Sequence, residues 1–185
     1  ITDCLAAVKY NVYAKKNFTM DELMAALDDN FIGHERILNL VKNHSPKYGN
    51  DDEYADEIMK QVFEYYQGEV TGRPNMLGGM YRVNMLPTTC HVYFGEVMMA
   101  SANGRLAHVP VSEGISPEKG ADVNGPTAVI KSCAKMDHLM TGGTLLNQKF
   151  TPSVVAGEEG LNQMASLIRS YFNMDGHHIQ FNVID

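Results

Sequence analysis

The last third of the chain follows an order of elements that restricts the folds open to it. Polar and apolar residues alternate over 178–183, which predicts a strand there. A broad apolar stripe over 161–172 predicts a helix that ends at Asp175-Gly176. An earlier helix begins at Gly125-Pro126, continues to about residue 140 and precedes a strand at 144–150. The sequence therefore predicts an α/β fold in which helices cover a few strands of a mixed sheet.

The rest of the chain divides into a helical part and an irregular part. Residues 2–16 have apolar side chains at helical spacing, and Thr19 with Glu22 forms the pattern of a capping box, with Phe18 and Leu23 as a hydrophobic staple. Helices are also predicted around Ile37 and, after an acidic start, from about residue 51 to 72. We expect one segment in three parts: 1–74 mainly helical, 75–123 irregular with a strand at 89–94, and 124–185 helix-strand-helix-strand.

Composition excludes several classes of protein. Apolar residues make up 44% of the 185 residues and charged residues 20%, and no apolar run approaches the roughly 18 residues of a membrane span. A net charge of -7 without a basic cluster argues against a nucleic-acid partner. We therefore expect a soluble protein that binds neither nucleic acid nor membrane.

The cysteines Cys4, Cys90 and Cys133 are odd in number and widely spaced, which argues against a disulfide framework. They include no Cys-x-x-Cys pair, so neither zinc nor an iron-sulfur cluster is predicted. A reducing cytoplasm fits this pattern, and a bacterial microcompartment is the narrower alternative. We expect Cys90 and Cys133 to be small buried apolar side chains.

Histidine pairs and a glycine turn offer other chemical interpretations. His177 and His178 point to opposite faces of a strand, so they cannot readily share a metal ion, and a structural or solvent-facing role is expected for them and for Asp137-His138. The segment 124–137 lacks the glycine and lysine spacing of a phosphate-binding loop. No metal ligand set is predicted.

Two long blocks of the chain are distinctive. They are residues 124–138, Asn-Gly-Pro-Thr-Ala-Val-Ile-Lys-Ser-Cys-Ala-Lys-Met-Asp-His, and residues 142–152, Gly-Gly-Thr-Leu-Leu-Asn-Gln-Lys-Phe-Thr-Pro. Both resemble the late part of glycyl radical enzymes. Further blocks match in family order from nearly one end of the chain to the other, at residues 46–56, 87–95, 104–105, 112–122 and 178–183. The blocks at 85–95 and 177–182 look more like the glycerol and propanediol dehydratases and choline trimethylamine-lyase than like pyruvate formate-lyase.

The resemblance implies a ten-stranded barrel made of two antiparallel half-barrels of five parallel strands, of which this segment would form late strands and their helices. The family's thiyl-cysteine loop, Gly-Cys-x-Glu, and its radical-glycine loop, Arg-Val-x-Gly-Tyr, are absent from the 185 residues. We therefore expect a fragment close to the C-terminal end of the enzyme, with no catalytic residue, no metal and no directly bound cofactor of its own. In the family the glycyl radical is installed by an activating enzyme that uses S-adenosylmethionine and an iron-sulfur cluster.

By resemblance, four side chains line the substrate pocket: Met85 and Leu86 before Pro87, and Ser153 and Val154 after residues 150–152. Ordinary packing in the barrel wall is the alternative for all four. The expected partners are the rest of the barrel, the activating enzyme, a small-molecule substrate and a second copy of the whole enzyme.

The function expected from the resemblance is radical elimination of water from glycerol or propane-1,2-diol by the whole enzyme, with the fragment inactive by itself. Choline trimethylamine-lyase and formate acetyltransferase activities are alternatives within the family. A separate alternative is a stand-alone binding module. An excised barrel wall differs from such a module in having open sheet edges and exposed apolar faces.

Overall fold

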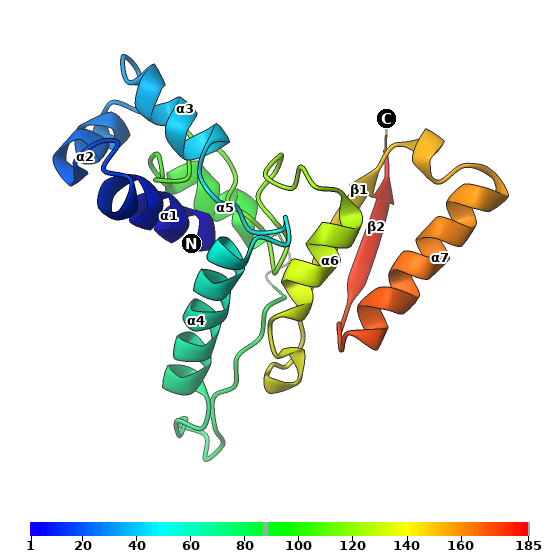
Figure 1. The fold of residues 1–185 in the computed structure, drawn as a ribbon. Coiled ribbons are helices and arrows are strands. Elements are labelled where there is room, and N and C mark those ends of the chain that lie inside the picture. The colour runs from blue at the N-terminus through cyan, green and yellow to red at the C-terminus, as the bar shows by residue number, and fades with distance from the viewer. Residues whose placement is uncertain (87–88, 185) are drawn as a thin grey trace.

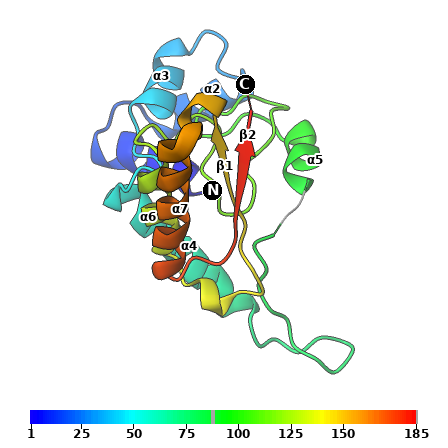
Figure 2. The same ribbon diagram turned by 90° about the vertical axis from the view of Figure 1, so that its right-hand side faces the viewer.

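The computed structural model describes residues 1–86 and 89–184, and it combines a helical N-terminal half with a small parallel sheet in the C-terminal half (Figures 1 and 2). The α/β class is confirmed, although the sheet formed by the described residues has two strands. The ten-stranded barrel remains an expectation for the whole protein. The elements are α1 (Thr2–Val8), η1 (Lys9–Ala14), α2 (Met20–Asp28), α3 (Glu35–Asn43), α4 (Glu53–Val70), α5 (Cys90–Val97), α6 (Pro126–Ala134), η2 (His138–Met140), β1 (Leu146–Phe150), η3 (Pro152–Val154), α7 (Gly157–Asn173) and β2 (Ile179–Val183).

The helix predicted at residues 2–16 is present, but its second half, η1, is a π-helix. Asn11 is fully buried there, and its side-chain amide donates to the carbonyl of Ala7 at 3.0 Å and to the hydroxyl of Ser45 at 2.8 Å. The amide thus occupies the carbonyl that the backbone N–H of an α-helix would use. This competition explains why the helix widens at this point.

The start of α2 follows the predicted capping box. The Thr19 hydroxyl accepts from the backbone N–H of Glu22 at 3.1 Å, and the Glu22 carboxylate accepts from the backbone N–H of Thr19 at 2.7 Å. Phe18 and Leu23 are both buried in one cluster of apolar side chains, as the staple predicts. The longest helix, α4, begins after Asp52, whose carboxylate accepts from the N–H of Tyr54 at 2.9 Å.

The C-terminal part is a β-α-β unit (Figure 1). Strands β1 and β2 run parallel, with Leu146 opposite Ile179 and Phe150 opposite Val183, and α7 makes the crossover between them. Leu146 and Gln148 are buried, whereas Lys149 is exposed. One face of β1 therefore packs under the helices and the other is more open.

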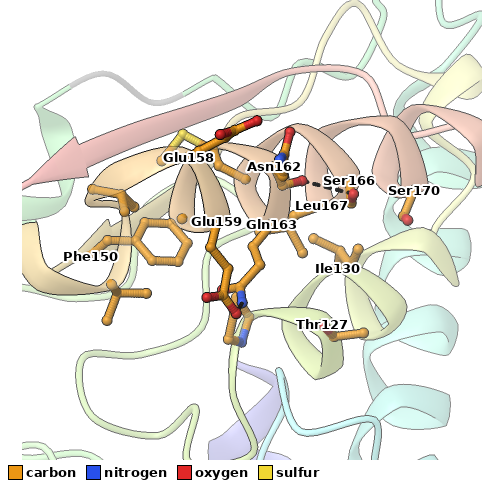
Figure 3. Close-up of a pocket in the computed structure, with 15 residues that line it drawn as sticks. Thr127, Ile130, Phe150, Glu158, Glu159, Asn162, Gln163, Ser166, Leu167 and Ser170 are labelled. Atoms are coloured by element: carbon orange, nitrogen blue, oxygen red, sulfur yellow. Dashed lines mark hydrogen bonds between the residues drawn. The ribbon is translucent and has the colours of Figure 1, made fainter.

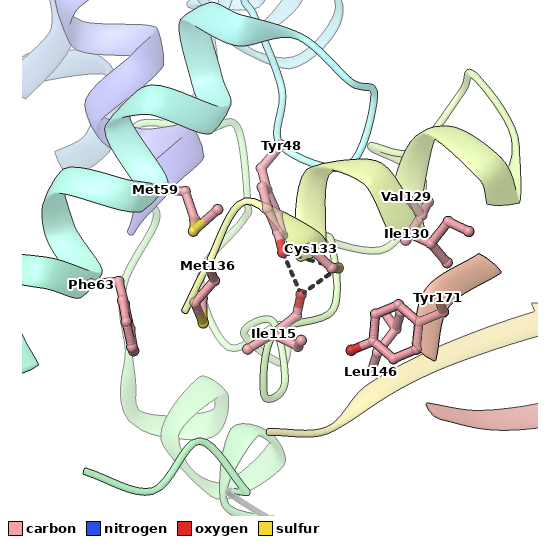
Figure 4. Close-up of a cluster of buried hydrophobic side chains, with 10 residues drawn as sticks. All are labelled: Tyr48, Met59, Phe63, Ile115, Val129, Ile130, Cys133, Met136, Leu146 and Tyr171. Carbon is pink, nitrogen blue, oxygen red and sulfur yellow. Dashed lines mark hydrogen bonds between the residues drawn. The ribbon is translucent and has the colours of Figure 1, made fainter. Parts of the chain in front are cut away.

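A central cluster joins the sheet to the helices (Figure 4). Within it, the hydroxyl of Tyr48 donates to the carbonyl of Ile115 at 2.9 Å and lies 3.1 Å from Sγ of Cys133. The loop that carries Ile115 is thereby held against α6 and the connection between α3 and α4. The cluster consists of Tyr48, Met59, Phe63, Ile115, Val129, Ile130, Cys133, Met136, Leu146 and Tyr171.

The strand predicted at 89–94 is wrong, because residues 90–97 form the helix α5. β-branched and aromatic residues favour a strand by propensity, but propensity yields to tertiary contacts. The backbone of Pro110 lies so close to Gly95 that a Cβ there would come within 2.4 Å of Pro110 Cα. Cys90, at the start of α5, is exposed and not buried as expected. The preceding Pro87 and Thr88 lie outside the described residues.

Within residues 1–86 and 89–184, none of the helices combines the length and apolar character that a membrane crossing needs.

Candidate active-site wall

Three segments lie side by side and form what we call the wall: residues 83–86, 142–150 and 177–183. Met85 forms a parallel bridge with Thr144, and its N–H donates to the carbonyl of Gly143 at 2.8 Å. The N–H of Gly142 donates to the carbonyl of Val83 at 2.8 Å. After Thr144 the same segment continues as β1, which pairs along its whole length with β2. The strand that carries β1 is therefore the middle of the wall, with residues 83–86 at its beginning.

Two of the four predicted pocket residues, Met85 and Leu86, belong to this wall. A Cβ added at Gly143 would lie 2.8 Å from Cδ1 of Leu86 and 3.4 Å from Cε1 of His177. The φ angle of Gly143 is 147°, in the region that favours glycine. The Leu86 side chain thus rests directly on the backbone at Gly143.

Ser153 and Val154, the other two predicted pocket residues, lie in η3, just after the far end of β1. The Ser153 hydroxyl is 3.3 Å from that of Thr151, and both Ser153 and Val154 are exposed in this chain. The two pairs of residues are therefore at opposite ends of β1, and neither of the two hollows described below is lined by residues of both pairs. Their role as pocket lining remains a proposal.

A cavity of about 800 Å³ lies next to Met85, between α4, the beginning of α1 and the loop at 112–118. Apolar side chains such as Met59 and Phe63 line it, together with the carboxyl groups of Asp3 and Glu118. Burial raises the pKa of Asp3, opposed by the N–H of Tyr48, which donates to its carboxylate at 2.8 Å. Burial likewise raises the pKa of Glu118.

Sequence reasoning did not single out these two carboxyl groups. Glu118 lies inside the matched block at 112–122, but Asp3 is far away in the chain, and their proximity depends on the tertiary fold. Lys47 shares this environment: burial lowers the pKa of its ammonium group, opposed by the charges of Asp3 and Glu118.

A second groove, of about 890 Å³, lies between α6, the end of β1 and α7 (Figure 3). Its floor is apolar, with Ile130, Phe150 and Leu167, and polar side chains of α7 such as Glu159 and Gln163 stand beside it. Val154 contributes to this groove, whereas Met85 lines the cavity beside α4. The two hollows are therefore lined by different parts of the wall.

His138 lies beneath the wall with its side chain 3% exposed. Its Nε2 is 3.0 Å from the carbonyl of Cys133, and its Nδ1 is 2.9 Å from the hydroxyl of Thr144. Burial lowers the pKa of His138, and the Cys133 carbonyl acts in the opposite direction. These buried hydrogen bonds favour a structural role for this histidine over a solvent-exposed one.

Metal chemistry finds no support among the described residues, where no group of three His, Cys, Asp or Glu side chains could hold an ion. His177 and His178 are exposed. Cys133 is buried as expected, and burial raises the pKa of its thiol to about 12, so the thiolate is disfavoured.

Comparison with known proteins places this wall in a family. A pyruvate formate lyase-like family model matches residues 1–95, and a glycine radical model matches residues 111–185. Trans-4-hydroxy-L-proline dehydratase from Clostridioides difficile is 72% identical over the whole chain. An isethionate sulfite-lyase from Bilophila wadsworthia is 40% identical, also over the whole chain. The chain spans only 23% and 22% of the lengths of these two relatives.

Solved structures agree. The Clostridioides difficile hydroxyproline dehydratase with trans-4-hydroxy-L-proline bound matches all of this chain with a TM-score of 0.98 at 72% identity, over 23% of its own length. The B12-independent glycerol dehydratase from Clostridium butyricum matches all of this chain with a TM-score of 0.94 at 42% identity, over 24% of its own length. The chain therefore belongs to the pyruvate formate lyase-like family of glycyl radical enzymes.

Proposed function

We propose that the whole protein is a glycyl radical dehydratase whose substrate is a hydroxylated cyclic amino acid of the 4-hydroxyproline type. The observation that supports this is the 72% identity to trans-4-hydroxy-L-proline dehydratase over all 185 residues, with a TM-score of 0.98. The glycerol dehydratase and a propanediol dehydratase are 42% and 39% identical over the same length. The higher identity to the hydroxyproline enzyme favours hydroxyproline over glycerol or propane-1,2-diol, the substrates expected from the sequence. These two compounds become the second candidates.

In this proposal the chain supplies structure around the reaction rather than the reacting groups. The glycyl radical, carried elsewhere in the whole protein, provides the means to abstract a hydrogen atom from a carbon of the substrate. The described wall excludes water and limits the space, because a radical survives only in a dry, closely packed site. Met85 and Leu86 contribute apolar surface at one end of β1, and Ser153 and Val154 contribute at the other.

The partners expected from the resemblance belong to the same proposal. They are the remaining barrel, a second copy of the enzyme, and an activating enzyme that uses S-adenosylmethionine and an iron-sulfur cluster. Apolar side chains exposed in this chain support a covering partner: Met76 is 95% exposed and Tyr65 75%. They also argue against the stand-alone module. A place in the cytoplasm, or in a microcompartment, and a position toward the C-terminal end of the enzyme remain predictions.

The test uses the full-length protein, activated without oxygen by its activating enzyme. Electron spin resonance should show a glycyl radical doublet, and mass spectrometry should show loss of water from trans-4-hydroxy-L-proline. Glycerol, propane-1,2-diol and choline serve as competing substrates, and an air-exposed sample serves as the inactive control. If the radical signal is present and only glycerol is turned over, glycerol replaces hydroxyproline as the substrate in this proposal. Full activation without any radical would overturn the proposal as a whole.

A further inference from the structure

Thr144 lies at the point where the proposed pocket lining joins the middle of the wall. It is fully buried and forms the parallel bridge with Met85. The adjacent Gly143 accepts the N–H of Met85 and supports the side chain of Leu86. A shift of Thr144 must therefore move the backbone against which both pocket residues rest.

The position of Thr144 is fixed from below by His138. A backbone carbonyl only accepts, so Nε2 of His138 carries a proton and donates to the carbonyl of Cys133. The other nitrogen, Nδ1, of the neutral ring then accepts from the Thr144 hydroxyl at 2.9 Å. One imidazole thereby connects the C-terminal turn of α6 to the beginning of the central strand.

The ring has little freedom to move. Tyr171 of α7 is fully buried and meets the imidazole edge to face, with 6.0 Å between ring centroids and 86° between the planes. The hydroxyl of Thr141 donates to the backbone carbonyl of His138 at 2.9 Å and accepts from the N–H of Gly143 at 3.1 Å. The segment that leads into the strand is thus held at both of its ends.

We propose that His138 is a positioning residue of the dehydratase: through Thr144 it fixes the backbone that places Met85 and Leu86 against the substrate. This inference rests on the proposed function, because it takes these two side chains as pocket lining. His138 itself contacts Cys133, Thr144 and Tyr171. Its effect should fall on substrate binding more than on the chemical step, since it acts through the backbone that carries the pocket lining.

The test compares isosteric variants of the activated full-length enzyme. Thr144→Val removes the hydroxyl and keeps the shape, and it should raise KM roughly five- to tenfold with kcat nearly unchanged, as expected for one lost buried hydrogen bond. Thr144→Ser retains a hydroxyl and should restore KM. Thr71→Val, at the exposed C-terminal end of α4, is the matched control and should leave both constants unchanged.

A second pair of variants covers the case in which Thr144→Val does not fold. His138→Asn keeps an acceptor near the position of Nδ1, and His138→Gln keeps a donor near that of Nε2 but loses the contact with Thr144. KM should rise in the Gln variant more than in the Asn variant. Equal KM values in the two, or a KM of Thr144→Val equal to that of Thr71→Val, would overturn the inference.

A readout without substrate separates this inference from the proposed function. Hydrogen exchange at the amide of Met85, which is bonded to Gly143, should accelerate in Thr144→Val and not in Thr71→Val. Faster exchange in an enzyme that turns over none of the candidate substrates would leave the positioning intact and refute the dehydratase assignment. Unchanged exchange and unchanged KM in an active enzyme would refute the positioning alone.

Discussion

Nζ of Lys135 lies 2.7 Å from Oδ2 of Asp56, and this ion pair connects the end of α6 to the first turns of α4. Asp56 is fully buried, and burial raises the pKa of its carboxyl group, opposed by the hydrogen bonds from Lys135 and Ser132. Lys135 also reaches Glu53 at 2.9 Å. The pair therefore compensates a charge that would otherwise be isolated in the interior.

Replacing Lys135 with Met should destabilise the full-length protein by about 3 kcal/mol, because the buried carboxylate loses its cation. In the variant the folded-state pKa of Asp56 lies above its unfolded value, so protonation of the carboxylate on acidification removes the cost of burying its charge. The loss of stability should therefore be largest near neutral pH and should diminish as the pH falls. Thermal unfolding at several pH values measures this. Lys131→Met is the matched control, since Lys131 makes only an exposed pair with Asp51 and should cost less than about 1 kcal/mol.

Adding a methyl group at two glycines should have opposite effects. At Gly95 a Cβ would lie 2.4 Å from Cα of Pro110, so Gly95→Ala should destabilise the protein by about 1–3 kcal/mol. At Gly68, inside α4, a Cβ meets nothing within 4 Å, and Gly68→Ala should stabilise by about 1 kcal/mol through helix propensity. Thermal unfolding of both variants decides this. Equal shifts in the same direction would contradict the packing of α5 described above.

The stability that His138 contributes should depend on pH. Its folded pKa is lowered, chiefly by burial, against the influence of the Cys133 carbonyl and the charges of Asp137 and Asp175. The unfolded chain therefore takes up a proton first as the pH falls. The stability that His138 contributes is fully present above the unfolded pKa of about 6.5. It is lost as the pH falls through the lower, folded pKa.

The difference in melting temperature between wild type and His138→Asn, measured from pH 8 to 5, should therefore shrink on acidification. The variant lacks the titrating ring but keeps a side-chain acceptor, so other groups cancel in the difference. A constant difference over this range would show that the histidine is not held neutral.

Shortening Leu86 should alter substrate selection. Leu86→Ala in the activated enzyme should raise KM for trans-4-hydroxy-L-proline roughly tenfold, because several methyl and methylene contacts are lost. Leu77→Ala is the matched control, since Leu77 is exposed near the tip of the hairpin at 72–81. Steady-state kinetics with each variant measures the effect. If the two variants behave alike, Leu86 is ordinary wall packing.

Local signals in the sequence predicted the elements that depend on local chemistry. The capping box at Thr19 and Glu22, the proline that begins α6 and the alternation that marks β2 are each encoded within a few residues. They were confirmed because the groups that satisfy one another are neighbours in the chain.

Other features depend on partners that are distant in sequence. The helix at 90–97 packs at Gly95 against the backbone of Pro110, a contact that its strand-forming residues do not reveal. Cys90 is expected to be buried as part of a strand at 89–94, and at the start of the helix it is exposed. The bridge between Met85 and Thr144, and the pairing of Asp3 with the backbone of Tyr48, join residues about 60 and 45 positions apart, which no local pattern reveals.

Parallel pairing of β1 with β2 has a consequence for how this region assembles. Two parallel strands cannot be joined by a tight turn. The contact between β1 and β2 must therefore wait until α7 has formed and folded back across them. During that delay the hydrogen-bonding groups of β1 are open to strands from other molecules. Synthesis of the protein at low temperature, or with a chaperone that shields extended segments, should therefore improve the yield of correctly assembled enzyme.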